Sequence, residues 1–188
     1  TIALLKANLA LGEYQKVLDI FAADSKYDLR VFLDDFFSGA KFQGKSNWVW
    51  SQIPRLYIYS RALLGLGRKV EARTSYARLL AEELTQSNGE IYWLALLDRG
   101  SIANAEGHAK EAAEYFVRAV DVIEAQRATL NTEIDKIGFL GDKQDAYASI
   151  VGAYFRLGDY EKALEYVERS KARALVDLLA AKKDFAVA

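Results

Sequence analysis

The sequence predicts an all-α fold in which antiparallel pairs of helices repeat along the chain. Four segments share one residue pattern around a glycine. The residues before three of these glycines carry apolar side chains at helical spacing, i, i+3, i+4 and i+7. The 188 residues contain a single proline, so few positions interrupt a helix.

The shared pattern is that of a tight turn between two helices, and it occurs at residues 11–21, 66–76, 106–116 and 157–167. The turn glycines are Gly12, Gly67, Gly107 and Gly158. Five positions later come the small or branched residues Val17, Ala72, Ala112 and Ala163, and four positions after those come Phe21, Tyr76, Phe116 and Val167. We expect the glycine to end the first helix in the left-handed conformation. The small residue then lets the second helix approach the first.

Helix start signals support these boundaries. Pro54 fits only the first turn of a helix, and Ser87 precedes Glu90 at the spacing of a capping box. Asp142 can cap the first helix of the last pair. The predicted helical hairpins cover about residues 1–24, 51–86, 88–137 and 142–183, within a single repeat array over residues 1–188.

This pattern resembles the tetratricopeptide repeat (TPR), in the glycine, the small residue five positions later and the aromatic residue that follows. Tyr14 and Tyr160, two positions after their glycines, match it as well. The resemblance implies a right-handed α-α superhelix. The turn glycines are further apart than the ~34 residues of a standard unit. We therefore expect long helices, including one through residues 111–137, and one inserted amphipathic helix at about residues 26–38.

The C-terminal helix narrows the resemblance. Residues 163–179, ALEYVERSKARALVDLL, and residues 140–143, LGDK, resemble the last repeat of bacterial TPR proteins that carry a caspase-like CHAT peptidase domain. The resemblance implies a non-catalytic interaction scaffold, the regulatory or partner-sensing region of such a protein, with any peptidase activity in a downstream domain. The sequence has no methionine and begins within an apolar helical pattern, so we expect a fragment of a longer protein. The alternative is a TPR sensor attached to a DNA-binding or kinase domain.

Composition argues against an enzyme. The chain has no cysteine, and its one histidine, His108, falls in a predicted turn, so neither a nucleophile–base pair nor a metal site is expected. Glycines occur singly, without a phosphate-binding loop, and no cofactor is predicted. The net charge of −1 gives no basic surface for nucleic acid, and no apolar run reaches the ~20 residues that span a membrane. The absence of cysteine agrees with a cytoplasmic location.

Two binding surfaces are predicted. TPR proteins bind peptides or partner helices on the concave face formed by their first helices. By repeat register, the residues on that face are Tyr57, Arg61, Ser101, Asn104, Phe155 and Arg156. The second surface is the end of the C-terminal helix, where Leu175, Leu178 and Leu179, with Arg173 at the rim, extend an apolar stripe that includes Tyr160 and Leu164. We expect this end to dock on the downstream domain or on a second copy of the chain. Gly100, seven residues before Gly107, is expected at a close helix crossing.

Overall fold

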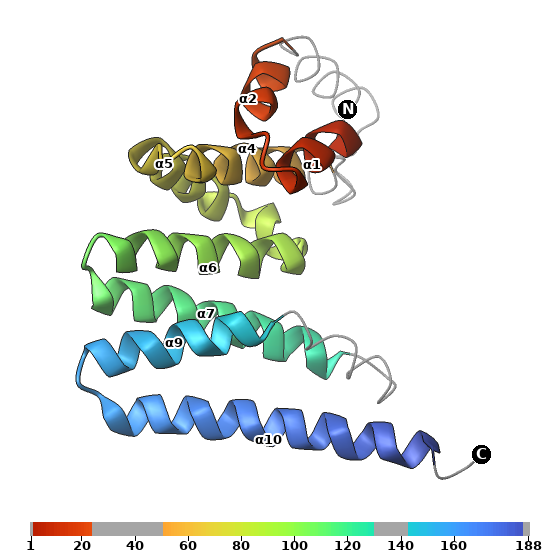
Figure 1. The fold of residues 1–188 in the computed structure, drawn as a ribbon, viewed down its shortest axis with the longest axis vertical. Coiled ribbons are helices and arrows are strands. Elements are labelled where there is room, and N and C mark those ends of the chain that lie inside the picture. Colours follow the sequence, from red (N-terminus) through yellow and green to blue (C-terminus); the bar gives the residue numbers. More distant parts are fainter. Residues whose placement is uncertain (1, 24–50, 130–142, 186–188) are drawn as a thin grey trace. The chain divides into compact units, whose positions relative to one another are not determined.

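The computed structural model describes residues 2–23, 51–129 and 143–185, with side chains of the last helix up to residue 172. Within these ranges every regular element is a helix, which confirms the all-α prediction (Figure 1). The α-helices are α1 (Ile2–Ala10), α2 (Tyr14–Ala23), α4 (Ile53–Gly65), α5 (Lys69–Ala81), α6 (Gly89–Ala105), α7 (Ala109–Ala128), α9 (Gln144–Arg156) and α10 (Tyr160–Phe185); a 3₁₀ helix, η3, covers Glu83–Ser87. The predicted inserted helix at residues 26–38 and the cap residue Asp142 lie outside the described residues.

The chain divides into two compact units, Thr1–Ala95 and Leu96–Ala188, with the boundary inside α6. In the first unit, α4 packs against α1, α2 and α5. In the second unit, α9 packs against α7 and α10. The single repeat array over residues 1–188 stays a prediction.

The four glycine turns have one geometry. Gly12, Gly67, Gly107 and Gly158 have φ values of 73°, 74°, 82° and 73°, in the left-handed region that favours glycine. At the last turn, Gly158 donates its N–H to the Phe155 carbonyl, and the N–H of Asp159 reaches back to the Tyr154 carbonyl. The same two bonds recur at the other three turns. This is the Schellman motif, which satisfies the free carbonyls at the end of the first helix.

The residue five positions after each glycine begins the packing of the second helix. Val17, Ala72 and Ala112 are fully buried and Ala163 is nearly so, and each donates its N–H to the carbonyl of the residue directly after the turn glycine. Of the aromatic positions that follow, Tyr76 and Phe116 are buried, whereas Phe21 and Val167 are half-buried. The predicted pairing of a small residue with a larger one therefore holds most firmly in the two middle hairpins.

The close crossing at Gly100 is confirmed. A Cβ atom built on Gly100 would lie 2.5 Å from Cε1 of the Phe116 ring, closer than real side chains approach. Phe116 is only 2% exposed and belongs to α7. The absent side chain of Gly100 thus makes room for the ring that joins α6 to α7 in the second unit.

Two helix ends differ from the prediction. Helix α7 ends at Ala128, within the helix predicted through residues 111–137, and residues 130–137 of that prediction lie outside the described residues. The Thr129 hydroxyl donates to the Gln126 carbonyl at 2.7 Å, and the Thr129 N–H bonds to the same oxygen, which closes the last turn. At the start of α6, the capping residue is Asn88 rather than Ser87: its Oδ1 accepts the N–H of Ile91 at 3.3 Å. Ser87 instead ends the 3₁₀ helix η3, which the sequence pattern did not indicate.

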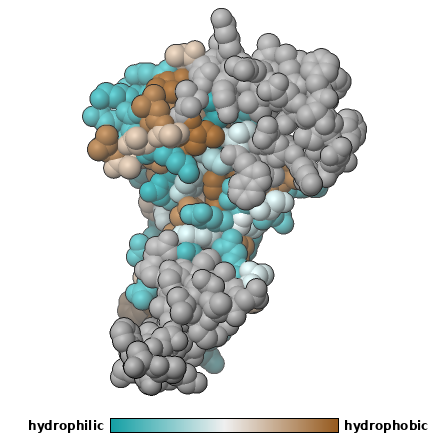
Figure 2. All heavy atoms as spheres, turned by 90° about the vertical axis from the view of Figure 1, so that its right-hand side faces the viewer, coloured by the Kyte–Doolittle hydropathy of each residue, from teal (hydrophilic) through white to brown (hydrophobic). Residues whose placement is uncertain are grey.

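Helix α1 is apolar nearly all round but buries little of its surface. Leu5 is fully buried, whereas Leu4 is 53% exposed, and Leu11 in the following turn is 77% exposed. The exposed alanines are Ala3, Ala7 and Ala10. Figure 2 shows hydrophobic surface in the upper part of the molecule, at the height that α1, α2, α4 and α5 share in Figure 1. A helix of this composition is normally covered on both sides. Helix α1 differs, because it presents an apolar face to solvent.

Candidate partner-binding surfaces

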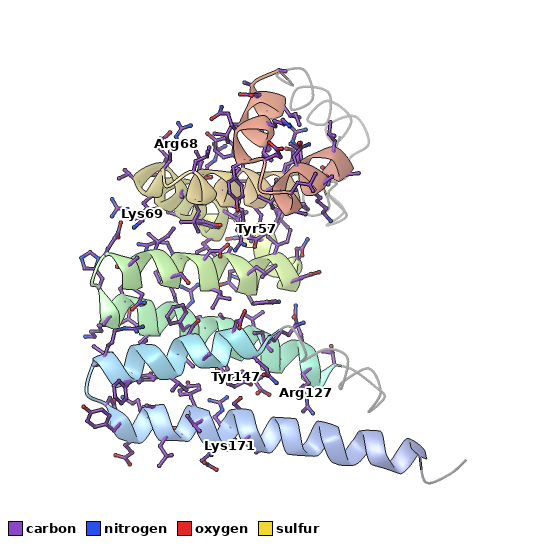
Figure 3. All side chains as sticks on the ribbon, in the orientation of Figure 1. Tyr57, Arg68, Lys69, Arg127, Tyr147 and Lys171 are labelled. Carbon is purple, nitrogen blue, oxygen red and sulfur yellow. The ribbon has the colours of Figure 1, made fainter. Side chains whose placement is uncertain are left out.

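Tyr57 and Arg61, two of the predicted binding residues, belong to α4 in the first unit. They are one helical turn apart and therefore share a face. Tyr57 is half-buried, with its ring centroid 6.4 Å from that of the buried Tyr76 in an edge-to-face arrangement (Figure 3). Arg61 is exposed. The pair presents a fixed aromatic edge beside a guanidinium, a combination suited to peptide recognition.

Ser101 and Asn104 lie on the part of α6 that belongs to the second unit. Ser101 is exposed, but its hydroxyl donates to the Leu97 carbonyl of the same helix at 2.9 Å, so only its oxygen lone pairs are available to a ligand. Asn104 is half-buried, and its Oδ1 atom is buried without a hydrogen-bond partner. These two side chains are therefore less accessible to a partner than their polar character suggests.

Phe155 and Arg156 end α9, also in the second unit. Phe155 is 63% exposed, and its ring packs edge-on against Tyr160 with centroids 5.3 Å apart. Arg156 is exposed, and its guanidinium lies near Gly152, 3.6 Å from the position that a Cβ atom there would take. Phe155 and Arg156 are adjacent in sequence, so their side chains point in different directions from the helix. The contact that the Phe155 ring makes is with Tyr160.

Phe155 belongs to a larger exposed cluster around the last turn, which we call the α9–α10 patch. Its members are Phe155, Leu157, Tyr160 and Leu164, and their exposed fractions are 63%, 43%, 62% and 61%. Single exposed apolar residues are common on protein surfaces, whereas four around one turn form a candidate interaction surface. Tyr160 and Leu164 were predicted on the apolar stripe of the C-terminal helix. Leu157 was missed as a surface residue because helical spacing places it on one apolar stripe with Ile150 and Tyr154, which was expected to be buried.

An ion pair borders the α9–α10 patch. Lys162 Nζ lies 2.8 Å from Asp159 Oδ2, and the Lys162 backbone N–H also donates to Asp159 Oδ1 at 3.2 Å. The side-chain hydrogen bond from Lys162, followed by the backbone bond, lowers the pKa of the Asp159 carboxyl group. Asp159 therefore stays ionised and caps the start of α10 beside the exposed aromatic rings.

The predicted docking residues Leu175, Leu178, Leu179 and Arg173 lie outside the residues whose side chains are described. The backbone of α10 nevertheless continues as one helix to Phe185. Because the two helices are antiparallel, α10 extends well beyond the N-terminal end of α9. Upstream of these residues the helix buries Ala163 and Tyr166, while Tyr160 and Leu164 face solvent. The predicted apolar stripe is thus divided between an inner face and an outer face.

A charged network occupies the other described turn of the second unit. Arg99 is buried on α6 and pairs with Glu111 of α7, with Nη2 and Oε1 2.5 Å apart. Nδ1 of His108 lies 3.6 Å from the other oxygen of Glu111, and the His108 side chain is 59% exposed, as expected for a turn residue. The nearby hollow of about 680 Å³ is lined by Gly107, His108, Ala109, Lys110, Glu111, Glu114 and Leu157. Among the described residues, no group of three His, Cys, Asp or Glu side chains could hold a metal ion.

A smaller groove of about 350 Å³ runs between α9 and α10. Its lining residues are Gln144, Asp145, Tyr147, Ala148, Val151, Val167, Ser170 and Lys171. Tyr147 and Lys171 lie on the two helices in Figure 3, and the Tyr147 hydroxyl is fixed by a hydrogen bond to Glu124 of α7. The lining thus combines apolar, amide and charged side chains.

No protein-family model matches the chain, and no curated protein matches its sequence. Within the described ranges, none of the helices combines the length and the apolar character that crossing a membrane requires.

Proposed function

We propose that this chain is a non-catalytic protein-interaction scaffold, built as a TPR-like right-handed superhelix. The observation that carries this proposal is the recurrence of one turn. Four glycines with positive φ, each with the residue that follows it, donate the same pair of hydrogen bonds, and a buried alanine or valine stands five positions after each glycine. Repeated hairpins of this kind stack their apolar faces and leave a series of helix surfaces for partners.

The exposed side chains support a protein or peptide as the partner. Phe155 and Tyr160 form an aromatic pair in solvent, Arg156 is next to them in sequence, and Tyr57 and Arg61 repeat the combination on α4. Aromatic rings and guanidinium groups dominate binding energies at protein interfaces. Nucleic acid is a less suitable partner, because the net charge of the chain is −1 and the basic side chains of α10 are interspersed with acidic ones.

Peptide binding can be tested on the purified chain. Peptides are selected from a displayed random library, and their affinities are then measured by fluorescence anisotropy. Phe155→Ala is expected to weaken binding about 30-fold, the loss of a hot-spot contact of ~2 kcal/mol. The matched control is Val70→Ala, which truncates another apolar side chain, 64% exposed, on α5. Equal affinities of the wild type and the Phe155 variant would contradict the assignment of Phe155 to the peptide-binding surface.

Within this function, the chain acts as the regulatory region of a cytoplasmic TPR–CHAT protein. The support is the resemblance of residues 163–179 to the closing helix of that family, together with the unbroken course of α10 to Phe185. Leu175, Leu178 and Leu179 then pack on the downstream peptidase domain, with Arg173 at the rim. A partner bound to the repeats acts on the peptidase through this helix.

The regulatory role is tested with Leu175→Asp and Leu178→Asp together, in the 188-residue chain and in the full-length protein. The shorter chain is expected to keep its melting temperature. In the full-length protein, calorimetry should show the repeat region and the downstream domain unfolding separately instead of together. Unfolding of the shorter chain would assign these leucines to the repeat's own core. A downstream sequence without a caspase-like His and Cys would remove the CHAT assignment.

A further inference from the structure

We infer that the partner segment bound at α9 carries an acidic side chain, and that the guanidinium of Arg156 recognises it. The inference rests on the proposed function and deepens it, because it names the chemistry of the partner at the same surface. Arg156 is exposed near the end of α9, on a helix that also presents the Phe155 ring to solvent.

The face of α9 that holds Arg156 is open in every hairpin of the chain. Helix α9 packs against both α7 and α10 (Figure 1). Its open face includes the positions six and two residues before the turn glycine. In the four hairpins these positions hold Lys6 and Ala10, Arg61 and Gly65, Ser101 and Ala105, and Gly152 and Arg156. Gly152 is half-buried and the other seven residues are exposed. The two middle hairpins share this openness, so it follows from how the hairpins pack.

Arg156 has no acidic neighbour on its own helix. A carboxylate three or four residues earlier could pair with it, but those positions hold Ala153 and Gly152. The next acid along the chain is Asp159, whose Oδ2 lies 2.8 Å from Lys162 Nζ. Oδ1 of Asp159 accepts the backbone N–H of Lys162 at 3.2 Å, so both carboxylate oxygens are engaged. Among the residues that the structure describes, Arg156 forms no ion pair.

The guanidinium of Arg156 has a defined place on α9. Its Nη1 and Nη2 atoms each lie 3.6 Å from the position that a Cβ atom of Gly152 would take. The guanidinium therefore lies along the helix beside a residue that has no side chain, and the exposed Arg156 can still donate to a partner. A guanidinium presents its donors as a planar fork, which matches the two oxygens of a carboxylate. A carboxylate of the partner is thus the group that this position suits.

Phe155 adds an apolar contact beside Arg156. Its ring is 63% exposed and packs edge-on against Tyr160, with centroids 5.3 Å apart. Successive side chains of a helix point about 100° apart, so Phe155 and Arg156 present different chemistry to one segment that crosses α9. The expected partner motif is therefore an acidic residue close to an apolar one.

The test uses peptides selected from the displayed random library on the 188-residue chain. Peptides selected on the wild type should be enriched in Asp or Glu near an apolar residue. Those selected on Arg156→Glu should be enriched in Lys or Arg instead. Because Arg156 is exposed, the variant should keep the wild-type circular dichroism spectrum and a similar melting temperature.

A double-mutant cycle then tests the contact itself. In one peptide selected on the wild type, replacing the acid by Gln should weaken binding about 5-fold, the contribution of an exposed ion pair. Fluorescence anisotropy measures the affinity. The same replacement should leave binding to Arg156→Gln unchanged, because that variant has already lost the pair.

The control for net charge is Arg78→Glu, which reverses an exposed arginine on α5 in the first unit. It should select the same acidic peptides as the wild type. Selected peptides without an acid, or the same preference in the wild type and Arg156→Glu, would overturn the inference alone, since Phe155→Ala can still weaken their binding. A preference for basic peptides in Arg78→Glu would also overturn it, by assigning the selectivity to net charge. Failure to select any peptide would remove the proposed function and the inference with it.

Discussion

Gly100→Ala is expected to lower the free energy of unfolding of the second unit by about 1–3 kcal/mol, the cost of overpacking a filled core. The new methyl group would come within 2.5 Å of the Phe116 ring. Phe116 is only 2% exposed, so its ring cannot avoid the methyl group without displacing other core side chains. Chemical denaturation followed by circular dichroism measures the loss directly.

Two comparisons make this result specific to the contact. Gly152→Ala introduces the same methyl group within α9, where its nearest neighbours are the guanidinium atoms of exposed Arg156 at 3.6 Å. It should raise stability by about 0.5–1 kcal/mol, because alanine favours helix more than glycine does. Adding Phe116→Leu to Gly100→Ala should cost less than the sum of the two single losses, since the smaller side chain relieves the clash. Strictly additive losses would mean that the two residues do not meet.

Glu111→Ala is expected to destabilise the second unit more than Arg99→Met does. Arg99 has a side chain only 9% exposed, and Glu111 is its ion-pair partner at 2.5 Å. Removing the carboxylate leaves a buried guanidinium beside the Tyr115 ring. Loss of one partner from a fully buried pair costs roughly 3–5 kcal/mol; because Glu111 is 37% exposed, we expect about 2 kcal/mol.

Arg99→Met removes the buried charge itself and keeps most of the side-chain volume, so its effect should be small. Glu114→Ala, an exposed acid that lines the same hollow, serves as the control and should change stability by less than about 0.5 kcal/mol. Thermal and denaturant unfolding of the three variants gives the ranking. If Arg99→Met is as damaging as Glu111→Ala, the pair contributes net stability rather than merely neutralising a buried charge.

The turns and the close crossing could be predicted from the sequence because they depend on single residues. Only glycine adopts positive φ without strain, so a recurring glycine with fixed neighbours marks a turn. Gly100 could be placed because its distance from Gly107 fixes its helix face. Helix ends were harder to predict, because two adjacent side chains can each accept the capping hydrogen bond and only one of them does. Ser87 and Asn88 are both good caps, but Ser87 belongs to the 3₁₀ helix, so Asn88 is the residue that caps α6.

The binding surfaces were predicted less completely. Helical register places Phe155 on the surface, but its ring contact with Tyr160 requires the turn that brings the two helices together. In the sequence, Asn104 is a polar residue that could contact a partner, yet its side-chain oxygen Oδ1 is buried in the folded chain. Arg99 carries no motif, and its burial against Glu111 appears only once α6 and α7 are paired. Register thus identifies faces, whereas accessibility depends on packing between helices.

The identical turns have a consequence for how the chain folds. Each turn is closed by a hydrogen bond that spans only six residues, such as the one from Glu13 to Asn8. Bringing two helices together over so short a loop costs little chain entropy. Each hairpin can therefore form early and independently, and association of hairpins becomes the slower step. In native-state hydrogen exchange, the amides of one hairpin should open together as a cooperative unit.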